Sequence, residues 1–423
     1  MTAIVAAADL DLGRVLRPGD RIVSGHASAE PGTLIETLTE QGSGIGGLSL
    51  FTATSFSGRF TPATAASFAL SSLGAIGALR IMAQAHQLAV IPCHIGQIGP
   101  LIEAGSIGCD VAFIQVSPAD ETGHHSLGLA GDYVRAAVRT ARVVVAEVND
   151  QVPFTYGELL PGADIDVAVP VSRPPVEVPA GPPGPVDEDI ARHAAAYVED
   201  GSVLQIGIGA VPEAITRRLR DRRDLGVHSG MLGDGLVDLV ESGAVTNARK
   251  PIDRGVSVTG LLIGTQRLFG FAHRNDALAL RDGGYISDPA VLARLDRLVT
   301  INSALEVDLG GQVNAEQSGP SYLGGTGGQV DFVRAGARSP GGHAIIALPA
   351  TARGGTISRI TARLSGPVTT ARTEVDVIVT EFGAAELKGR PLAERARRLV
   401  AIAHPAFRED LEREARSIQQ RGY

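Results

Sequence analysis

The chain has 423 residues and a formal net charge of −8, with 44% hydrophobic and 20% charged residues. This composition is typical of a globular protein, and the length predicts two domains rather than one. The acidic balance and the absence of a basic run argue against a nucleic-acid partner, which would be bound through phosphate contacts. An anionic small molecule is not excluded, because helix N-termini and glycine-rich loops bind phosphate without net positive charge.

Targeting and metal signals are weak throughout. Cys93 and Cys109 lie in no CxxC or Cys/His cluster, so we expect no metal site. The apolar N-terminus is interrupted by Asp9 and Asp11 and has no basic leader, so we expect no signal peptide. No uncharged apolar stretch is long enough for a transmembrane helix. We therefore expect a soluble, cytoplasmic protein with no membrane partner.

Both halves alternate short β-branched runs with longer helical patterns. In the first half we predict strands at residues 20–25, 88–93, 111–117 and 142–148, and helices at 34–41 and 132–141. In the second half we predict a helix at 211–221 and strands at 202–209, 297–304, 330–333, 343–350 and 376–383. The alternation predicts an α/β fold class with open, mostly parallel sheets covered on both faces.

A proline-rich stretch, Pro170–Pro185, marks the clearest boundary. Proline fixes φ and lacks the N–H that helix and sheet interiors need, so the stretch is expected to be an extended linker. We assign residues 1–170 to an N-terminal α/β domain, 171–185 to the linker and 186–423 to a C-terminal α/β domain.

Two glycine-rich segments of the second half are candidate ligand loops. The segment Gln205–Gly209 ends a strand in Gly-x-Gly before Pro212, a corner where backbone N–H groups can face a phosphate or a developing oxyanion. The run Gly324–Gly328 has four glycines in five residues, which permits close approach to a ligand. The alternatives are a plain tight turn for the first segment and a flexible surface loop for the second.

Two histidine segments are candidate catalytic loops. In the segment from His228 to Asp234, the histidine is a candidate base, Ser229 a candidate nucleophile and Asp234 an orienting acid. The alternative, which we favour for Ser229, is that Ser229 and Asp234 cap a helix beginning near Leu236. His26 follows the first strand, where it either faces a cleft or belongs to a loop that caps the next helix.

Taken in order, these segments resemble the acetyl-CoA hydrolase / 4-hydroxybutyrate CoA-transferase family. The motifs that carry the resemblance include GDRIVSGHASAEP, IQVSPADETGHHSLG, LQIGIGAVPEAI, LGVHSGMLGDGLVDLVESG, GGTGGQVDFVR and AIIALPATARGGTISRI, and the likeness runs from Gly19 to Arg408. The resemblance implies two open α/β domains of the CoA-transferase type, an active site in the cleft between them, and CoA bound mainly by the second domain. It implies acyl-CoA as substrate and no permanently bound cofactor, and it leaves open whether the chain is a homodimer.

The resemblance also assigns individual residues. The CoA-binding and oxyanion loop matches Gln205, Ile206, Gly207, Ile208 and Gly209. A second CoA-binding loop matches Gly325, Thr326, Gly327, Gly328 and Gln329, in which Gly328 corresponds to a glycine that lies against the CoA. Arg353 falls where relatives commonly have a lysine near the CoA, and His26 matches a histidine near the active-site entrance.

One position departs from the family pattern. Relatives read H-S-E-M or H-T-E-M, and that glutamate attacks the thioester to form an anhydride and then a glutamyl-CoA; this chain reads His228-Ser229-Gly230-Met231. Glycine has no side chain and cannot form either intermediate. Asp234 and Glu241 match non-nucleophilic positions, and Glu213 is expected to face solvent.

Three hypotheses follow. The leading one is an enzyme that polarises a bound acyl-CoA with the Gly207–Gly209 backbone and passes the acyl group directly to an amine, alcohol, carbanion or water. The second is a ping-pong CoA-transferase or hydrolase that uses another nucleophile. The third is a non-catalytic acyl-CoA binder. Under the first, His26 and His228 are the candidate bases.

Overall fold

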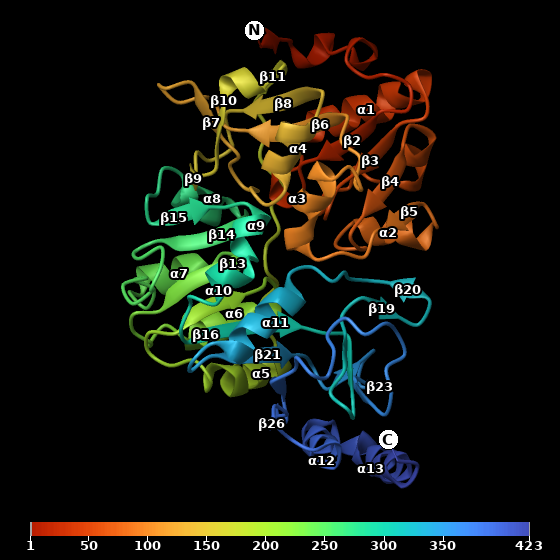
Figure 1. Ribbon diagram of the computed structural model, residues 1–423, viewed down its shortest axis with the longest axis vertical. Helices are drawn as coiled ribbons and strands as arrows, with labels where there is room; N and C mark the ends of the chain where they lie inside the picture. Colours follow the sequence, from red (N-terminus) through yellow and green to blue (C-terminus); the bar gives the residue numbers. More distant parts are fainter. Residues whose placement is uncertain (1, 423) are drawn as a thin grey trace. The chain divides into compact units, whose positions relative to one another are not determined.

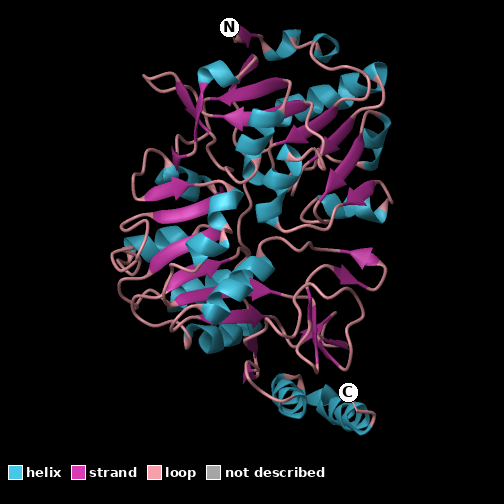
Figure 2. Cartoon of the chain, in the orientation of Figure 1, coloured by secondary structure: helices cyan, strands magenta, loops and turns pink. Residues whose placement is uncertain are grey.

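The computed structural model describes residues 2–422 and divides the chain into two compact units. Unit 1 contains the chain up to Pro179 together with Ser257–Asp288 and Tyr322–Gly327. Unit 2 contains Ala180–Val256, Pro289–Ser321 and the chain from Gly328 onward. Each unit has parallel strands with helices packed against them (Figures 1 and 2).

Unit 1 is built on an eight-stranded parallel sheet with strand order β1-β11-β8-β6-β2-β3-β4-β5. In chain order its strands are β1 (Ala3–Ile4), β2 (Arg21–Ser24), β3 (Ser49–Phe51), β4 (Ala69–Ser72), β5 (Leu88–Val90), β6 (Val111–Val116), β8 (Val143–Asn149) and β11 (Val167–Val171).

The sheet of unit 1 is covered on both faces, as its apolar strands predict. All six residues of β6 are buried, and they alternate between two cores because successive side chains point to opposite faces. Val111 and Phe113 belong to one apolar cluster, whereas Ala112, Ile114 and Val116 belong to the other. The first cluster includes Leu34 and Leu38 of helix α1 and the second includes residues of α3 and α4, so the helices complete both layers.

The helices of unit 1 are α1 (Gly32–Ile45), α2 (Leu79–Gln84), α3 (Ile95–Glu103), α4 (Val134–Thr140), α8 (Gln266–Ala272) and α9 (Gly283–Ile286). Its remaining strands are an antiparallel pair, β7 (His124–Ser126) and β10 (Leu159–Pro161), and a parallel ladder of β9 (Tyr156–Gly157), β14 (Ser257–Leu262) and β15 (Leu278–Leu280).

The division differs from the contiguous halves expected from the sequence, because two segments beyond the linker belong to unit 1. The backbone N–H of Gly131 donates to the carbonyl of Gly260 at 3.0 Å. A β-carbon on Gly96 would lie 2.7 Å from Cβ of Ser287, which shows how closely α3 approaches the end of α9. Such contacts join residues far apart in sequence, and the composition of the linker does not predict them.

The proline-rich segment is extended, as expected, and it is attached to unit 1 before the chain enters unit 2. The N–H of Val178 donates to Gly264 O at 2.8 Å, and the Glu177 carboxylate accepts from Gln266 N at 3.2 Å. Helix α5 (Pro185–Ala195) then begins with Asp187 in its first turn, where the carboxylate accepts from Gly184 N at 2.8 Å.

Unit 2 contains the strand order β26-β25-β21-β16-β12-β13, in which only the β25–β26 pair is antiparallel. These strands are β12 (Val203–Ile206), β13 (Gly226–Leu232), β16 (Leu298–Ser303), β21 (His343–Ala347), β25 (Val377–Thr380) and β26 (Gly383–Glu386). Its shorter strands are β17 (Glu306–Asp308), β18 (Val313–Asn314), β19 (Gln317–Ser318), β22 (Thr351–Ala352), β23 (Ile357–Ser358) and β24 (Ile360–Thr361), and β20 (Ser321–Tyr322) crosses the unit boundary.

The helices of unit 2 are α5, α6 (Ala210–Arg218), α7 (Gly235–Glu241), α10 (Pro289–Leu292), α11 (Gln329–Arg338), α12 (Leu392–Ile402) and α13 (Pro405–Gln420). The α/β fold class is confirmed, and each predicted strand has its counterpart except residues 330–333. That prediction is wrong, because Val330–Phe332 lie in α11. The buried positions Gln329, Val333 and Gly336 recur at helical spacing, so one face of α11 packs on the sheet. Among the described helices, none has the length and apolar character to cross a membrane.

Candidate active site

The corner loop, Gln205–Gly209, joins β12 to α6 and has the geometry of an anion site. Among the described residues, the backbone N–H groups of Gly207, Ile208 and Gly209 have no protein acceptor. Gly209 is the N-cap residue of α6 with φ +112°, a conformation that only glycine adopts readily. These donors therefore lie at the N-terminus of a helix, where its dipole also favours negative charge.

A hydroxyl on the neighbouring strand fixes the corner loop. Ser229 on β13 is fully buried, and its Oγ accepts from Ile206 N at 3.3 Å. The same Oγ lies 3.0 Å from Ile206 O and 2.8 Å from Met231 O, so its proton has two carbonyl acceptors within reach. Ser229 therefore neither caps α7, as we favoured, nor presents a free hydroxyl; it ties the end of β12 to β13.

Residue 230 lies on β13 beside an aromatic ring of α11. A β-carbon on Gly230 would lie 3.4 Å from Cε2 of Phe332 and would meet no other neighbour more closely. His228 is fully buried and lies two residues away, so it belongs to the same face of the strand as Gly230. The strand continues to Leu232, so residues 228 and 230 have regular strand geometry rather than loop geometry.

The other expected catalytic residue, Asp234, occupies the N-cap position of α7. Its side chain makes no capping hydrogen bond to that helix, so the predicted capping role is wrong. Asp234 follows β13 directly and is half-buried, which keeps a carboxylate at this end of the strand.

Two amide side chains connect the ends of neighbouring elements in unit 2. Gln205 on β12 and Asn302 on β16 exchange hydrogen bonds, with Asn302 Nδ2 donating to Gln205 Oε1 at 3.0 Å. Gln329 begins α11, and its Nε2 donates to Ser303 O at 2.7 Å while its Oε1 accepts from Thr370 Oγ1 at 3.1 Å. Gln205 and Gln329 are therefore both linked to the end of β16, which brings the corner loop and the start of α11 to one region of unit 2.

The second glycine-rich loop is divided between the units. Gly325–Gly327 belong to unit 1, where Gly325 bridges Gly74 and the Gly327 carbonyl accepts from Ile95 N at 2.9 Å. A β-carbon on Gly325 would lie 2.7 Å from Leu73, so this glycine is required by packing. Thr326 lies between them, whereas Gly328 belongs to unit 2 as the N-cap residue of α11.

His26 lies in unit 1 with both ring nitrogens occupied. Nε2 is 2.8 Å from Asp132 Oδ2 and Nδ1 is 3.1 Å from Thr54 Oγ1, and the ring stacks on Tyr133 at a centroid distance of 4.9 Å. The His26 side chain is fully buried. This arrangement orients the imidazole firmly and leaves neither nitrogen available to a substrate in this conformation.

The remaining assigned residues lie apart from these contacts. Arg353 is exposed in the turn between β22 and β23 with φ 49°. Glu241 is exposed at the end of α7. Glu213 was expected to face solvent, and that expectation is wrong: its side chain is only 16% exposed and lies 3.5 Å from Arg217 on the same helix. In the described part of the chain, no group of three or more His, Cys, Asp or Glu could hold a metal ion.

Sequence reasoning missed a buried lysine beneath β13. Lys250 is 1% exposed, and its Nζ donates to Val227 O at 2.9 Å and to Val256 O at 2.7 Å. Burial lowers the pKa of Lys250 to about 8, because desolvation disfavours the charged form. The lysine reaches the backbone immediately before His228, so it supports the strand that carries His228 and Gly230.

Comparisons with known proteins agree with this architecture. The family models of the acetyl-CoA hydrolase/transferase N-terminal and C-terminal domains match residues 66–178 and 264–415. A 4-hydroxybutyrate coenzyme A transferase from Clostridium kluyveri is 39% identical over 396 residues, which cover 92% of each chain. The chain belongs to the acetyl-CoA hydrolase/transferase family.

Solved structures support the same assignment across the whole chain. RipA from Yersinia pestis is 33% identical with a TM-score of 0.92, covering 99% of this chain and 98% of that one. A 4-hydroxybutyrate CoA-transferase from Porphyromonas gingivalis is 34% identical with a TM-score of 0.83, and the match covers 98% of this chain and 97% of that one. The expected family and enzyme class, a transferase that uses CoA thioesters, are confirmed.

Proposed function

We propose that this chain passes the acyl group of a bound acyl-CoA directly to an acceptor, without a glutamyl-CoA intermediate. The observation that carries the proposal is Gly230, which offers no carboxylate on β13 next to a corner loop whose N–H groups have no protein acceptor. Relatives named as CoA-transferases and acetyl-CoA hydrolases indicate a CoA thioester as the substrate.

The proposed step uses the N–H groups of Gly207, Ile208 and Gly209 as an oxyanion hole. The acceptor attacks the thioester carbonyl carbon, the negative charge develops on the carbonyl oxygen, and fixed N–H donors stabilise it. The C–S bond then breaks, and CoA leaves as a thiolate that takes up the proton lost by the acceptor. Binding and orienting the thioester and the acceptor supply a large part of the rate enhancement of such a reaction.

We assign proton transfer to His228 rather than His26. His228 shares a strand face with Gly230, whereas both nitrogens of His26 already have protein partners. Gln205, Gly325–Gln329 and Arg353 are proposed to hold the CoA, as the resemblance implies.

Ping-pong CoA transfer or hydrolysis is the second candidate, because it is what the names of the relatives describe. Mass spectrometry of the products separates the candidates when acyl-CoAs are mixed with amines, alcohols and free carboxylates. Direct transfer predicts free CoA together with an acylated amine or alcohol. CoA appearing on the added carboxylate would contradict the proposal in favour of ping-pong transfer, and binding without turnover would favour a binding protein.

A further inference from the structure

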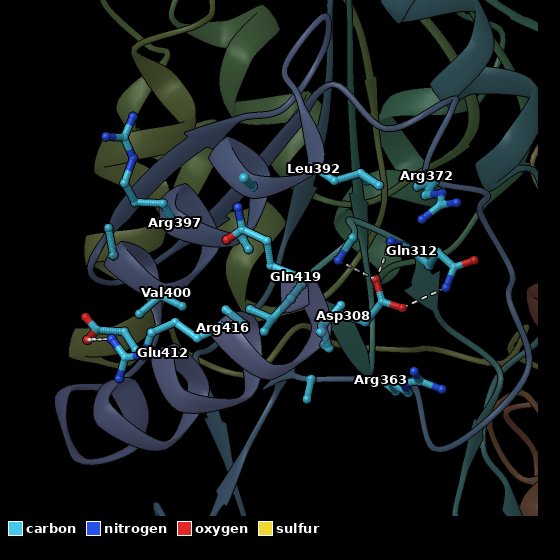
Figure 3. Close-up of a pocket in the computed structure, with 18 of the residues that line it drawn as sticks. Asp308, Gln312, Arg363, Arg372, Leu392, Arg397, Val400, Glu412, Arg416 and Gln419 are labelled. Atoms are coloured by element: carbon cyan, nitrogen blue, oxygen red, sulfur yellow. Dashed lines mark hydrogen bonds and ion pairs between the residues drawn. The ribbon is translucent and has the colours of Figure 1, made fainter. Parts of the chain in front are cut away.

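The C-terminal helices of unit 2 enclose a pocket outside the residues assigned to catalysis. The arginine pocket, about 720 Å³ in volume, lies between α12, α13, the turn after β17 and the segment after β24 (Figure 3). Its lining includes five arginines, Arg363, Arg372, Arg397, Arg408 and Arg416, and only two carboxylates, Asp308 and Glu412. The pocket is therefore cationic within a chain of net charge −8.

One side of the pocket presents cations with no acidic partner. Figure 3 shows Arg363 and Arg372 on the same side as Asp308. Asp308 forms no ion pair with either arginine; its oxygens accept from Gly310 N at 3.0 Å, Gln312 N at 2.9 Å and Gln312 Nε2 at 2.7 Å. Among the described residues, neither Arg363 nor Arg372 forms an ion pair within 4.0 Å.

The other arginines of the lining are already engaged. Arg416 pairs with Glu412 at 3.9 Å and Arg397 with Glu394 at 4.0 Å. Arg408 donates to Ala403 O at 2.9 Å. The lining also includes the apolar residues Leu364, Leu392, Ala396, Val400 and Ile418.

A buried arginine holds the cationic side in place. Arg395 on α12 is 9% exposed, and its guanidinium donates to Arg372 O at 2.6 Å and Gly310 O at 3.3 Å. These bonds fix the backbone that carries Arg372 and the turn that carries Asp308. Arg395 therefore holds the backbone on this side of the pocket, from which the exposed side chains of Arg363 and Arg372 extend.

We infer that the arginine pocket binds an amphiphilic anion, a carboxylate or phosphate head joined to a short hydrocarbon chain. Arg363 and Arg372 would bind the head, because guanidinium groups match planar carboxylate and phosphate oxygens. The apolar surface of α12 and α13 would cover the chain, and the volume lies in the usual range for small-molecule sites. This site is additional to the proposed acyl-CoA site.

Calorimetric titration tests the inference with octanoate and octyl phosphate as probes and with octanol and octyltrimethylammonium as neutral and cationic controls. The titrations are run without CoA, whose own phosphates could occupy the pocket, and the variants described below distinguish this site from the acyl-CoA site. The two anions should bind and the two controls should bind far more weakly, and the comparison of octanoate with octyl phosphate identifies the preferred head. If the anions do not bind, or if octanol binds as tightly as octanoate, the inference is overturned.

Variants locate the binding site. The double variant Arg363→Gln/Arg372→Gln should weaken octanoate binding by roughly tenfold to a hundredfold, the usual effect of losing charge-assisted hydrogen bonds. Ala401→Trp should fill the pocket and weaken binding without a change of charge. Arg413→Gln is the matched control, because Arg413 lies on α13 outside the lining and pairs with Glu409. Unchanged binding in both the double variant and Ala401→Trp would overturn the inference, whatever the result of the acyl-transfer assay.

Discussion

A β-carbon placed on Gly230 would lie 3.4 Å from the ring of Phe332, so β13 accepts a β-carbon at the position where relatives are expected to carry glutamate. The φ angle of Gly230 is not positive, so its backbone conformation suits any residue. The lack of a carboxylate here is therefore a matter of side-chain chemistry, not of backbone constraint.

Gly230→Glu tests whether the surroundings still accept the family mechanism. We expect the variant to fold and to gain exchange of CoA between an acyl-CoA and free carboxylates, because the new carboxylate can store the CoA. Gly230→Gln is the matched control, with the same shape and no nucleophile. Exchange kinetics with labelled acetate measure the gain, and equal exchange in the Gln variant would contradict this explanation.

Gly209→Ala tests the corner loop. Gly209 has φ +112°, so we expect alanine there to cost roughly 1–3 kcal/mol of stability and to turn the N–H donors away from the thioester oxygen, lowering kcat. Gly207→Ala is the control for stability, because nothing lies within 4 Å of its β-carbon position and its φ is not positive. Denaturant unfolding compares the stability of the two variants, and acyl-CoA turnover is measured for Gly209→Ala. An equal loss of stability in the two variants would show that the positive φ at Gly209 does not matter.

Ser229→Ala removes the link between β13 and the end of β12. The N–H of Ile206 would lose its buried acceptor, so we expect a loss of about 1–3 kcal/mol in the free energy of unfolding. The matched control is Ser242→Ala, which removes an exposed hydroxyl bonded to Leu239 O at 3.1 Å. Urea unfolding measures both, and a Ser229 variant as stable as the control would argue against the link.

Lys250 makes the free energy of unfolding depend on pH in the alkaline range. Its folded pKa of about 8 lies below the unfolded value of 10.5, so between these values the unfolded chain binds more protons and stability rises with pH. Across this pH range the free energy of unfolding gains roughly 3 kcal/mol from Lys250, and only the part of the gain below about pH 9 is easily measured. Above that pH the buried thiol of Cys109, whose pKa burial raises to about 12, acts in the opposite direction.

Comparison with Lys250→Met isolates this contribution, because Cys109 titrates in both proteins. Wild-type stability should rise relative to the variant as pH increases from about 7 to 9. Unfolding by urea at several pH values measures the difference. Parallel stability curves for the two proteins would show that Lys250 does not titrate in this range.

Local sequence patterns predicted most helices and strands, and they failed where contacts with residues distant in sequence determine the structure or role of a segment. The corner loop was predictable because a buried run ends in Gly-x-Gly before a helical pattern. Residues 330–333 were misassigned because four apolar-rich residues fit a strand or a helix, and only the longer spacing to Gly336 distinguishes them. The capping role for Ser229 was wrong because its partner, Ile206, lies on another strand.

Other parts of the candidate site could not be read from one sequence. Gly325 appeared to be a ligand-binding glycine, yet its contact with Leu73 shows a packing requirement that depends on a residue about 250 positions away. Asn302 carried a usable signal, since a polar residue within a buried apolar strand requires a partner. No sequence signal indicated that Lys250 is buried, because a single lysine is usually exposed.

Covalent trapping of the wild-type protein tests the central claim most directly. The protein is incubated with an acyl-CoA, treated with borohydride or hydroxylamine, digested and mapped by mass spectrometry. Because Gly230 offers no carboxylate, we predict that no peptide carries a CoA thioester or its trapped derivative. A modified carboxylate at Asp234, Glu213, Glu241 or any other position would contradict direct transfer and establish a ping-pong mechanism.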